Sequence, residues 1–295
     1  DEQRYFKKGT TCDVFKIGTS KISMNICEDI WEDTGPLTIQ SSKGASLIIN
    51  INASPFNVTK RSLREDTIKS QAIKNNVQIA YVNQIGGQDE LVFDGSSIIV
   101  NSEGEIIARA KQFHEELLTH DLIMPTPTPD NSHKITSTLD IPKNISKKNR
   151  EITPQLHNPI RPIEEIYKAL VLGTKDYVTK NGFQKVLIAL SGGIDSSLVA
   201  AIAVDAFGKD NVMGISMPSS FSSEGSKTDA YELAENLGID IKTIPIQNMF
   251  NIMQQSLDPV FDGLPWDVTE ENIQSRIRGN IIMDQSNKFN AKILT

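Results

Sequence analysis

Residues 186–197 decide the fold of this chain and read VLIALSGGIDSS. The apolar run at 186–190 is typical of a strand that is buried on both faces. A glycine pair, Gly192 and Gly193, follows directly, and the apolar segment 198–207 then predicts a helix. A strand, a tight glycine turn and a helix in this order are the first unit of a parallel sheet.

The same alternation continues on both sides of this stretch. The spacing of apolar residues predicts helices at 163–180, 227–237 and 248–257 and strands at 212–217 and 241–245. Strands that alternate with helices form a parallel sheet. We therefore expect an α/β, Rossmann-like domain over residues 163–295.

The N-terminal part of the chain is also built from short β-branched runs. It predicts strands at 21–26, 45–51, 78–84 and 97–101 and an amphipathic helix at 60–75. From residue 124 to 162 the composition changes to Pro, Thr, Ser, Asn and Lys, which favours an extended, mobile linker. The sequence thus predicts one domain at 1–123, a linker at 124–162 and a second domain at 163–295.

Composition narrows the class of protein. The formal net charge of -7 argues against a chain whose main task is to hold a nucleic acid backbone. The two cysteines, Cys12 and Cys27, are too few for a disulfide framework and have no metal-ligand spacing. No apolar run is long enough to cross a membrane. We expect a cytoplasmic protein that binds neither nucleic acid nor membrane.

The glycine turn has the chemistry of a phosphate site. Backbone N–H groups point outward there at the positive end of a helix, and Ser191 and Ser196 add hydroxyl donors. Asp195 suits an anion site only when a cation such as Mg²⁺ neutralises it. The loop is neither a Walker A motif, since the lysine is absent, nor the dinucleotide fingerprint, which needs a third glycine. The alternative is a plain glycine turn that caps a helix.

The segment from Ser191 to Ser196 resembles the S-G-G-x-D-S signature of the ATP-pyrophosphatase superfamily. That resemblance implies an enzyme that cleaves ATP between its α- and β-phosphates to adenylate a substrate. It also implies an ATP site at Ala189, Leu190, Ser191, Gly192, Gly193, Ile194, Asp195 and Ser196, with Asp195 as the Mg²⁺ ligand.

Cys27 follows a predicted strand and precedes two acidic residues, Glu28 and Asp29. A thiol at a strand end can face a pocket, and amide cleavage there needs a base and oxyanion donors as well. The alternative is a small core residue.

Four segments, 21–31, 52–56 with Lys60, 81–90 and 91–95, resemble the carbon-nitrogen hydrolase (nitrilase) superfamily, and specifically the glutaminase domain of NAD synthetases. The resemblance implies part of a nitrilase-like αββα sandwich in which Cys27 forms a thioester with glutamine. It also implies that Glu28, Ser54 and Lys60 hold the glutamine. Lys60 as a solvated helix-start lysine and Ser54 as the start of a turn before Pro55 stay open alternatives.

A nitrilase-like glutaminase ahead of an ATP-pyrophosphatase loop resembles glutamine-dependent NAD synthetases. Residues 271–280 are similar to that family's deamido-NAD helix, which implies contacts from Asn272 and Arg276; a plain surface helix is the alternative. The implied reaction is amidation of deamido-NAD to NAD through an acyl adenylate, with ATP, Mg²⁺ and glutamine, in a homodimer or larger homo-oligomer. The competing functions are an amidohydrolase whose second region only binds nucleotide, and a degenerate nucleotide-binding scaffold.

In the family that this sequence resembles, the catalytic Glu and Lys of the glutaminase site come from segments that would precede Asp1. The family's Gly-Asn-Lys-Ser-Glu segment would follow Thr295. We therefore expect this sequence to be cut short at both ends.

Overall fold

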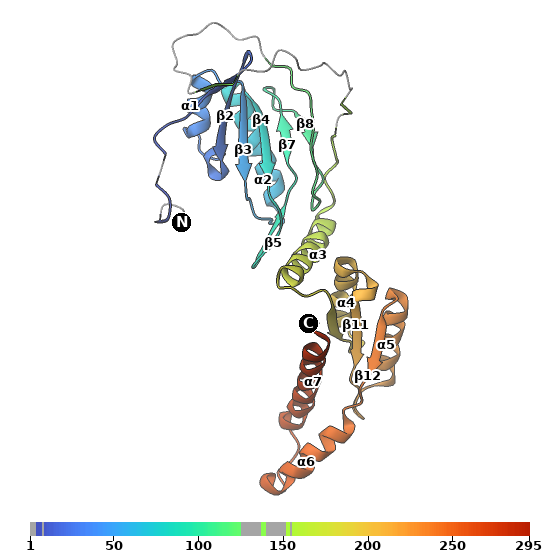
Figure 1. Ribbon diagram of the computed structural model, residues 1–295. Coiled ribbons are helices and arrows are strands. Elements are labelled where there is room, and N and C mark those ends of the chain that lie inside the picture. The colour runs from blue at the N-terminus through green and yellow to red at the C-terminus, as the bar shows by residue number, and fades with distance from the viewer. Residues whose placement is uncertain (1–3, 8, 125–136, 140–151, 154) are drawn as a thin grey trace. The chain divides into compact units, whose positions relative to one another are not determined.

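The structure is a computed structural model that describes residues 4–7, 9–124, 137–139, 152–153 and 155–295. The chain divides into two compact units (Figure 1). Unit 1 comprises residues 1–86 and 90–169, and unit 2 comprises residues 87–89 and 170–295. Each unit is built around its own sheet.

Unit 1 contains a seven-stranded sheet with the order β8-β7-β4-β3-β2-β1-β9. Its strands are β1 (Phe15–Ile17), β2 (Ser20–Ile26), β3 (Leu47–Asn52), β4 (Gln78–Asn83), β7 (Ile98–Val100), β8 (Ile106–Arg109) and β9 (Ser137–Leu139). The central strands β2, β3 and β4 pair in parallel, and β1 pairs in parallel with β9. The pairs β1–β2, β4–β7 and β7–β8 are antiparallel. β5 (Ile85–Gln88) and β6 (Leu91–Asp94) form a separate two-stranded sheet.

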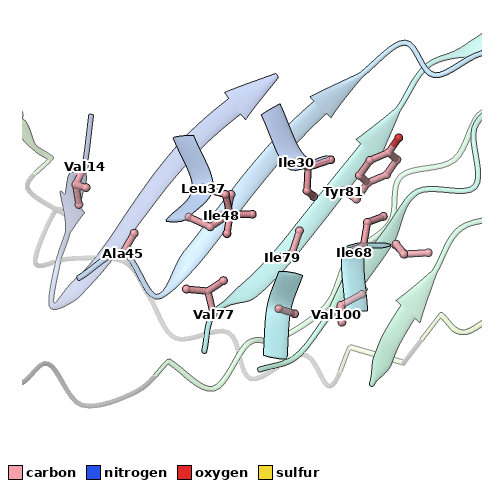
Figure 2. Packing of buried hydrophobic residues seen from close by; sticks show 12 residues of the cluster. Val14, Ile30, Leu37, Ala45, Ile48, Ile68, Val77, Ile79, Tyr81 and Val100 are labelled. Atoms are coloured by element: carbon pink, nitrogen blue, oxygen red, sulfur yellow. The ribbon is translucent and has the colours of Figure 1, made fainter. Parts of the chain in front are cut away.

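Two helices, α1 (Pro36–Ser42) and α2 (Lys60–Asn75), cover one face of this sheet. Leu37 of α1 and Ile68 of α2 pack on Ile48 and Ile79 of the central strands, as Figure 2 shows. Burial alternates along these strands, and the opposite face exposes Met24, Ile26, Ile51 and Val82. An apolar face of this kind is where the sandwich expected from the resemblance would place its second sheet.

Unit 2 contains a four-stranded parallel sheet with the order β12-β11-β10-β13. Its elements are α3 (Pro162–Lys180), which begins in unit 1, β10 (Val186–Ala189), α4 (Ile194–Phe207), β11 (Val212–Ser216), α5 (Glu224–Leu237), β12 (Asp240–Thr243), α6 (Gln247–Phe261), α7 (Val268–Phe289) and β13 (Lys292–Leu294). The expected Rossmann-like parallel sheet is confirmed.

Helices cover both faces of the sheet of unit 2. Val212 of β11 packs with α4 and α5, whereas Ile215, three residues later on the opposite face, packs with α6 and α7. After β12 the chain returns to place β13 on the other side of β10. The strand order therefore reverses next to β10, and ligands of such sheets bind outside the carboxyl ends of the strands at this reversal.

Most elements agree with the expected positions, and the differences lie at element ends and in short strands. Helix α4 begins at Ile194, four residues before the expected start, because the end of the glycine loop is already helical. β9 lies inside the expected linker, where it pairs with β1. The rest of the linker expectation falls largely on residues 125–136, 140–151 and 154, outside the described residues.

A buried ion pair fixes the base of the β5–β6 hairpin to α2. Arg64 donates from Nη1 to Asp94 Oδ1 at 3.0 Å and from Nη2 to Asp94 Oδ2 at 2.8 Å. The two side chains are only 3% and 2% exposed. Water therefore cannot replace either partner when the other is removed.

We expect Asp94→Asn to lower the free energy of unfolding of unit 1 by about 3–5 kcal/mol, because the guanidinium of Arg64 stays buried without a carboxylate. The matched control is Asp33→Asn, whose partner Lys74 is 46% exposed, and about 1 kcal/mol or less should be lost there. Urea denaturation followed by Trp31 fluorescence in a Trp266→Phe background measures both. Equal losses would contradict the assignment.

Candidate functional site

The glycine loop after β10 has a backbone that a side chain cannot replace at one position. Gly192 has φ +80°, and a Cβ there would lie 2.2 Å from the carbonyl oxygen of Ser226 in α5. Gly193 has an ordinary extended φ of -88° and caps α4. The first glycine therefore lets the loop pass directly against the start of α5.

The serines of the loop hold its shape. The hydroxyls of Ser196 and Ser197 donate to the carbonyl oxygen of Gly193 at 3.0 and 2.9 Å. Ser191 shares a hydrogen bond between its Oγ and that of Ser196 at 3.1 Å and accepts the N–H of Gly193 at 3.2 Å. The loop is thus preorganised at the N-terminus of α4, the end of a helix that attracts anions.

A cavity of about 460 Å³ opens beside this loop at the carboxyl ends of β10 and β11. It is lined by Ala189, Leu190, Ser191, Ile215, Ser216, Met217, Pro218, Phe221, Ser222, Ser223, Ser226, Lys227 and Arg278. The volume suits a nucleotide-sized ligand. Its polar lining is mostly serine hydroxyls together with two cationic side chains.

The cationic side chains come from the two helical layers. Arg278 of α7 donates from Nε to the carbonyl oxygen of Met217 at 3.1 Å, which fixes the guanidinium at the cavity. Burial lowers the pKa of Arg278 from its usual value, and arginine still stays charged at neutral pH. Lys227 of α5 forms an ion pair with Glu224 at 2.7 Å. Both cations can reach toward an anionic ligand in the cavity.

Only some of the residues predicted to bind ATP line the cavity. Ala189, Leu190 and Ser191 line it, while residues 192–196 form the adjoining loop and first turn of α4. The carboxylate-bearing Asp195 is exposed on that turn. No group of three or more His, Cys, Asp or Glu side chains that could hold a metal ion occurs in the described part of the chain.

Asn272 and Arg276 lie one turn apart on α7, are exposed and do not line the cavity. Sequence reasoning missed Lys227 and Arg278. Lys227 carried a weak signal, since it follows a serine-rich loop at a helix start. Arg278 lies two positions beyond Arg276, and only the rotation of α7 shows which of the two faces the sheet.

We expect Gly192→Ala to abolish ATP binding or reduce it at least tenfold, because a Cβ at φ +80° would collide with the backbone of Ser226. Gly193→Ala is the matched control: its nearest neighbour would be Ser191 Oγ at 3.3 Å, and affinity should change less than about threefold. Equilibrium binding of an ATP analogue to both variants measures this. Equal tolerance would show that the loop does not need its close approach to α5.

The second candidate site surrounds Cys27 in unit 1. Cys27 follows directly after β2, as expected, and opens the 3-10 helix η2 (Cys27–Ile30) with φ +45°. A left-handed backbone is uncommon for a residue with a side chain and occurs often where function requires it. The N–H of Ile26 donates to Asp29 Oδ2 at 2.9 Å, which closes the turn. Cys27 is half-buried, and Glu28 next to it is exposed.

Ser54 lies at the same edge of the sheet as Cys27, after the end of the neighbouring strand β3, and is buried. Its N–H donates to Asn83 Oδ1 at 2.9 Å. Lys60 is the first residue of α2 and is half-buried, and its N–H donates to the carbonyl oxygen of Asn57 at 3.0 Å. Ser54 is therefore fixed by its backbone, which the sequence alone did not show.

Comparisons with known proteins match both units. Residues 1–127 match the family model of carbon-nitrogen hydrolases, and residues 166–295 match that of NAD synthases. The whole chain is 45% identical to the glutamine-dependent NAD(+) synthetase of Thermotoga maritima and 43% identical to that of Aquifex aeolicus. It covers 53% and 54% of these two proteins and so spans about half their length.

Solved structures give the same result. A glutamine-dependent NAD+ synthetase from Acinetobacter baumannii, in complex with ADP, matches with a TM-score of 0.80 and 37% identity. That match covers 99% of this chain and 51% of the other. A second, from Cytophaga hutchinsonii, has a TM-score of 0.69 at 20% identity and shows the fold alone. The chain therefore has a nitrilase-like fold followed by an NAD synthetase fold.

In the described residues, no helix is both long and apolar enough to cross a membrane.

Proposed function

We propose that this chain belongs to the family of glutamine-dependent NAD(+) synthetases, which it resembles over its whole length, and that it amidates deamido-NAD to NAD at the expense of ATP. Glutamine supplies the ammonia. The observation that carries this proposal is the presence of two built sites on one chain: a phosphate loop beside a nucleotide-sized cavity, and a cysteine at a strained strand end. The match of residues 166–295 to NAD synthases argues against an amidohydrolase whose second region only binds nucleotide.

The glycine loop and its cavity would bind ATP. The N–H groups at the start of α4 and the hydroxyls of Ser191 and Ser196 would hold the phosphates, with Lys227 and Arg278 adding positive charge. The carboxylate of deamido-NAD attacks the α-phosphate, the bond to the β-phosphate breaks, and pyrophosphate leaves. An acyl adenylate results, whose carbonyl carbon ammonia then attacks to release AMP.

A magnesium ion fits the residues present. Asp195 is an exposed carboxylate beside backbone N–H groups that would otherwise attract only anions. Mg²⁺ is commonly held by one or two carboxylates together with substrate phosphates and water, so a single aspartate suffices. When bound, the ion would neutralise the charge of the departing pyrophosphate. Asp195 would hold that ion at the start of α4.

Cys27 would release the ammonia. Its thiolate attacks the side-chain carbonyl carbon of glutamine, a carbon–sulfur bond forms, and the carbon–nitrogen bond breaks as ammonia leaves with a proton from an acid. Water then hydrolyses the thioester to glutamate. Glu28, Ser54 and Lys60 would hold the glutamine. Two further features belong to this proposal: a cytoplasmic location and a homodimer or larger homo-oligomer.

The domain boundaries are proposed as well: a glutaminase part at 1–123, a linker at 124–162 and a synthetase part at 163–295. The ranges of the two family matches, 1–127 and 166–295, support this division.

We expect Cys27→Ala, in the protein expressed from its complete reading frame, to abolish NAD formation from glutamine and to keep NAD formation from ammonium. Asp195→Ala should reduce both by at least a hundredfold, because both need the adenylate. Steady-state NAD production with each nitrogen source measures this. If Cys27→Ala stops both reactions, the division of roles is wrong; substantial synthesis by Asp195→Ala removes Asp195 from the metal site.

Two arginines on α7 should contact different substrates, Arg278 contacting ATP and Arg276 contacting deamido-NAD. Arg278→Met should raise the KM for ATP roughly tenfold or more, because it removes a partly desolvated cation from the cavity. Arg276→Met, the matched control two residues away, should leave the KM for ATP unchanged and raise that for deamido-NAD. Initial rates over both substrates at saturating ammonium decide it. The opposite pattern would exchange the two assignments.

A further inference from the structure

Polar side chains form a buried layer at the carboxyl ends of the three parallel strands of unit 1. Successive inward positions place Asn25 on β2, Asn50 and Asn52 on β3, and Tyr81 and Asn83 on β4. The register pairs Asn25 with Asn50 and Asn50 with Tyr81, and it pairs Asn52 with Asn83. Cys27 and Ser54 continue the same inward rows beyond the ends of β2 and β3.

Much of this polar layer is internally satisfied. Asn50 Nδ2 donates to Asn25 Oδ1 at 2.7 Å, and Asn25 Nδ2 donates to Gln40 Oε1 at 3.1 Å. Asn83 holds Ser54 from both sides: its Oδ1 accepts the N–H of Ser54, and its Nδ2 lies 3.4 Å from the carbonyl oxygen. These amides therefore serve to fix the edge of the sheet.

Three buried oxygens of the layer have no hydrogen bond of normal geometry among the described residues, although the Tyr81 and Ser54 side chains lie close enough to interact with each other. They are Tyr81 Oη, Ser54 Oγ and Asn52 Oδ1. Tyr81 is 1% exposed and Ser54 is 5% exposed. A buried hydroxyl without a partner costs free energy, so a native structure keeps it for a reason, and a bound ligand is one such reason.

The Tyr81 phenol lies among the groups of the proposed glutamine site. It is next to the Ser54 hydroxyl and within electrostatic reach of Cys27. Its ring lies under Arg64, whose Cζ is 5.8 Å from the ring centroid, and Arg64 is itself fixed by Asp94. Figure 2 shows the Tyr81 hydroxyl oxygen near the arrowheads of the strands, at the end of the apolar cluster.

Burial raises the pKa of Tyr81 to about 12, against the opposing effect of the Arg64 charge. The phenol thus keeps its proton at neutral pH and can donate it in a hydrogen bond. Together, two hydroxyls and an amide oxygen offer donors and acceptors at one place, which suits a ligand that carries both kinds of group, as glutamine does.

We propose that Tyr81 is a further glutamine-binding residue, whose hydroxyl donates a hydrogen bond to an oxygen of the bound glutamine beside Ser54. This inference rests on the proposed role of Cys27. Cys27 would attack the glutamine, and the Tyr81 hydroxyl on β4 would select and orient it.

Tyr81→Phe tests the proposal, because it removes one oxygen and keeps the ring. We expect kcat/KM for glutamine to fall roughly tenfold, the ammonium-supported rate to stay within about twofold, and the urea midpoint of unit 1 to stay or rise. The midpoint separates the roles: a structural hydrogen bond would lower it on removal, whereas an unpaired buried hydroxyl would not. Wild-type kcat/KM for glutamine in Tyr81→Phe would overturn the proposal, as would an equal loss with both nitrogen sources.

Ser23→Ala is the matched control. Ser23 lies on β2, and its buried hydroxyl is on the same face of the sheet as Tyr81. Its Oγ donates to the carbonyl oxygen of Asp13. Its loss should lower the urea midpoint and leave kcat/KM for glutamine unchanged. A fall in kcat/KM as large as that of Tyr81→Phe would show that any lost hydroxyl in this face has the same effect and would contradict the assignment.

A second measurement does not depend on turnover. In a Cys12→Ala background, alkylation of Cys27 by iodoacetamide is followed by peptide mass spectrometry, and bound glutamine should slow it. Tyr81→Phe should need about tenfold more glutamine for half-protection, and unchanged protection would overturn the proposal.

Cys27→Ala separates a failure of the proposed function from a failure of the inference about Tyr81. If Cys27→Ala keeps the glutamine-supported reaction, the proposed function itself fails. If it abolishes that reaction while Tyr81→Phe behaves as wild type, only the inference about Tyr81 fails.

Discussion

Parallel strand pairing is the constraint on which the rest of this structure depends. Strands that run in the same direction bring their carboxyl ends to one edge, and loops that leave this edge meet there. In unit 1, β2, β3 and β4 end together and deliver Cys27, Ser54 and Asn83. In unit 2, β10 and β11 end together beside the glycine loop and the cavity.

The two edges are stabilised in different ways, and each way suits its proposed chemistry. The edge of unit 2 relies on backbone: a glycine at φ +80° packs against α5, and serine hydroxyls close the loop. Backbone N–H groups are thereby left for an anion. The edge of unit 1 relies on buried side-chain amides and on the Arg64–Asp94 ion pair. Rigid support of this kind keeps a substrate in one orientation against a nucleophile.

The sequence predicted the elements that local pattern determines. The helix at 60–75, the strand before the glycine loop and the position of Cys27 at a strand end agree with the structure. Long-range pairing determines the rest: β9 and β13 are three residues each and become strands only beside β1 and β10. Arg278 and Tyr81 were missed because a side chain's surroundings depend on helix rotation and strand register.

One isotope experiment tests the central claim, that one protein carries an ammonia-releasing edge and an adenylating edge. Deamido-NAD, ATP and glutamine labelled with ¹⁵N in its side-chain amide are supplied to the protein expressed from its complete reading frame. The account predicts ¹⁵N in the carboxamide of NAD, with one AMP and one pyrophosphate for each NAD. Glutamate and ammonia without labelled NAD, or ADP and phosphate in place of AMP and pyrophosphate, would contradict it.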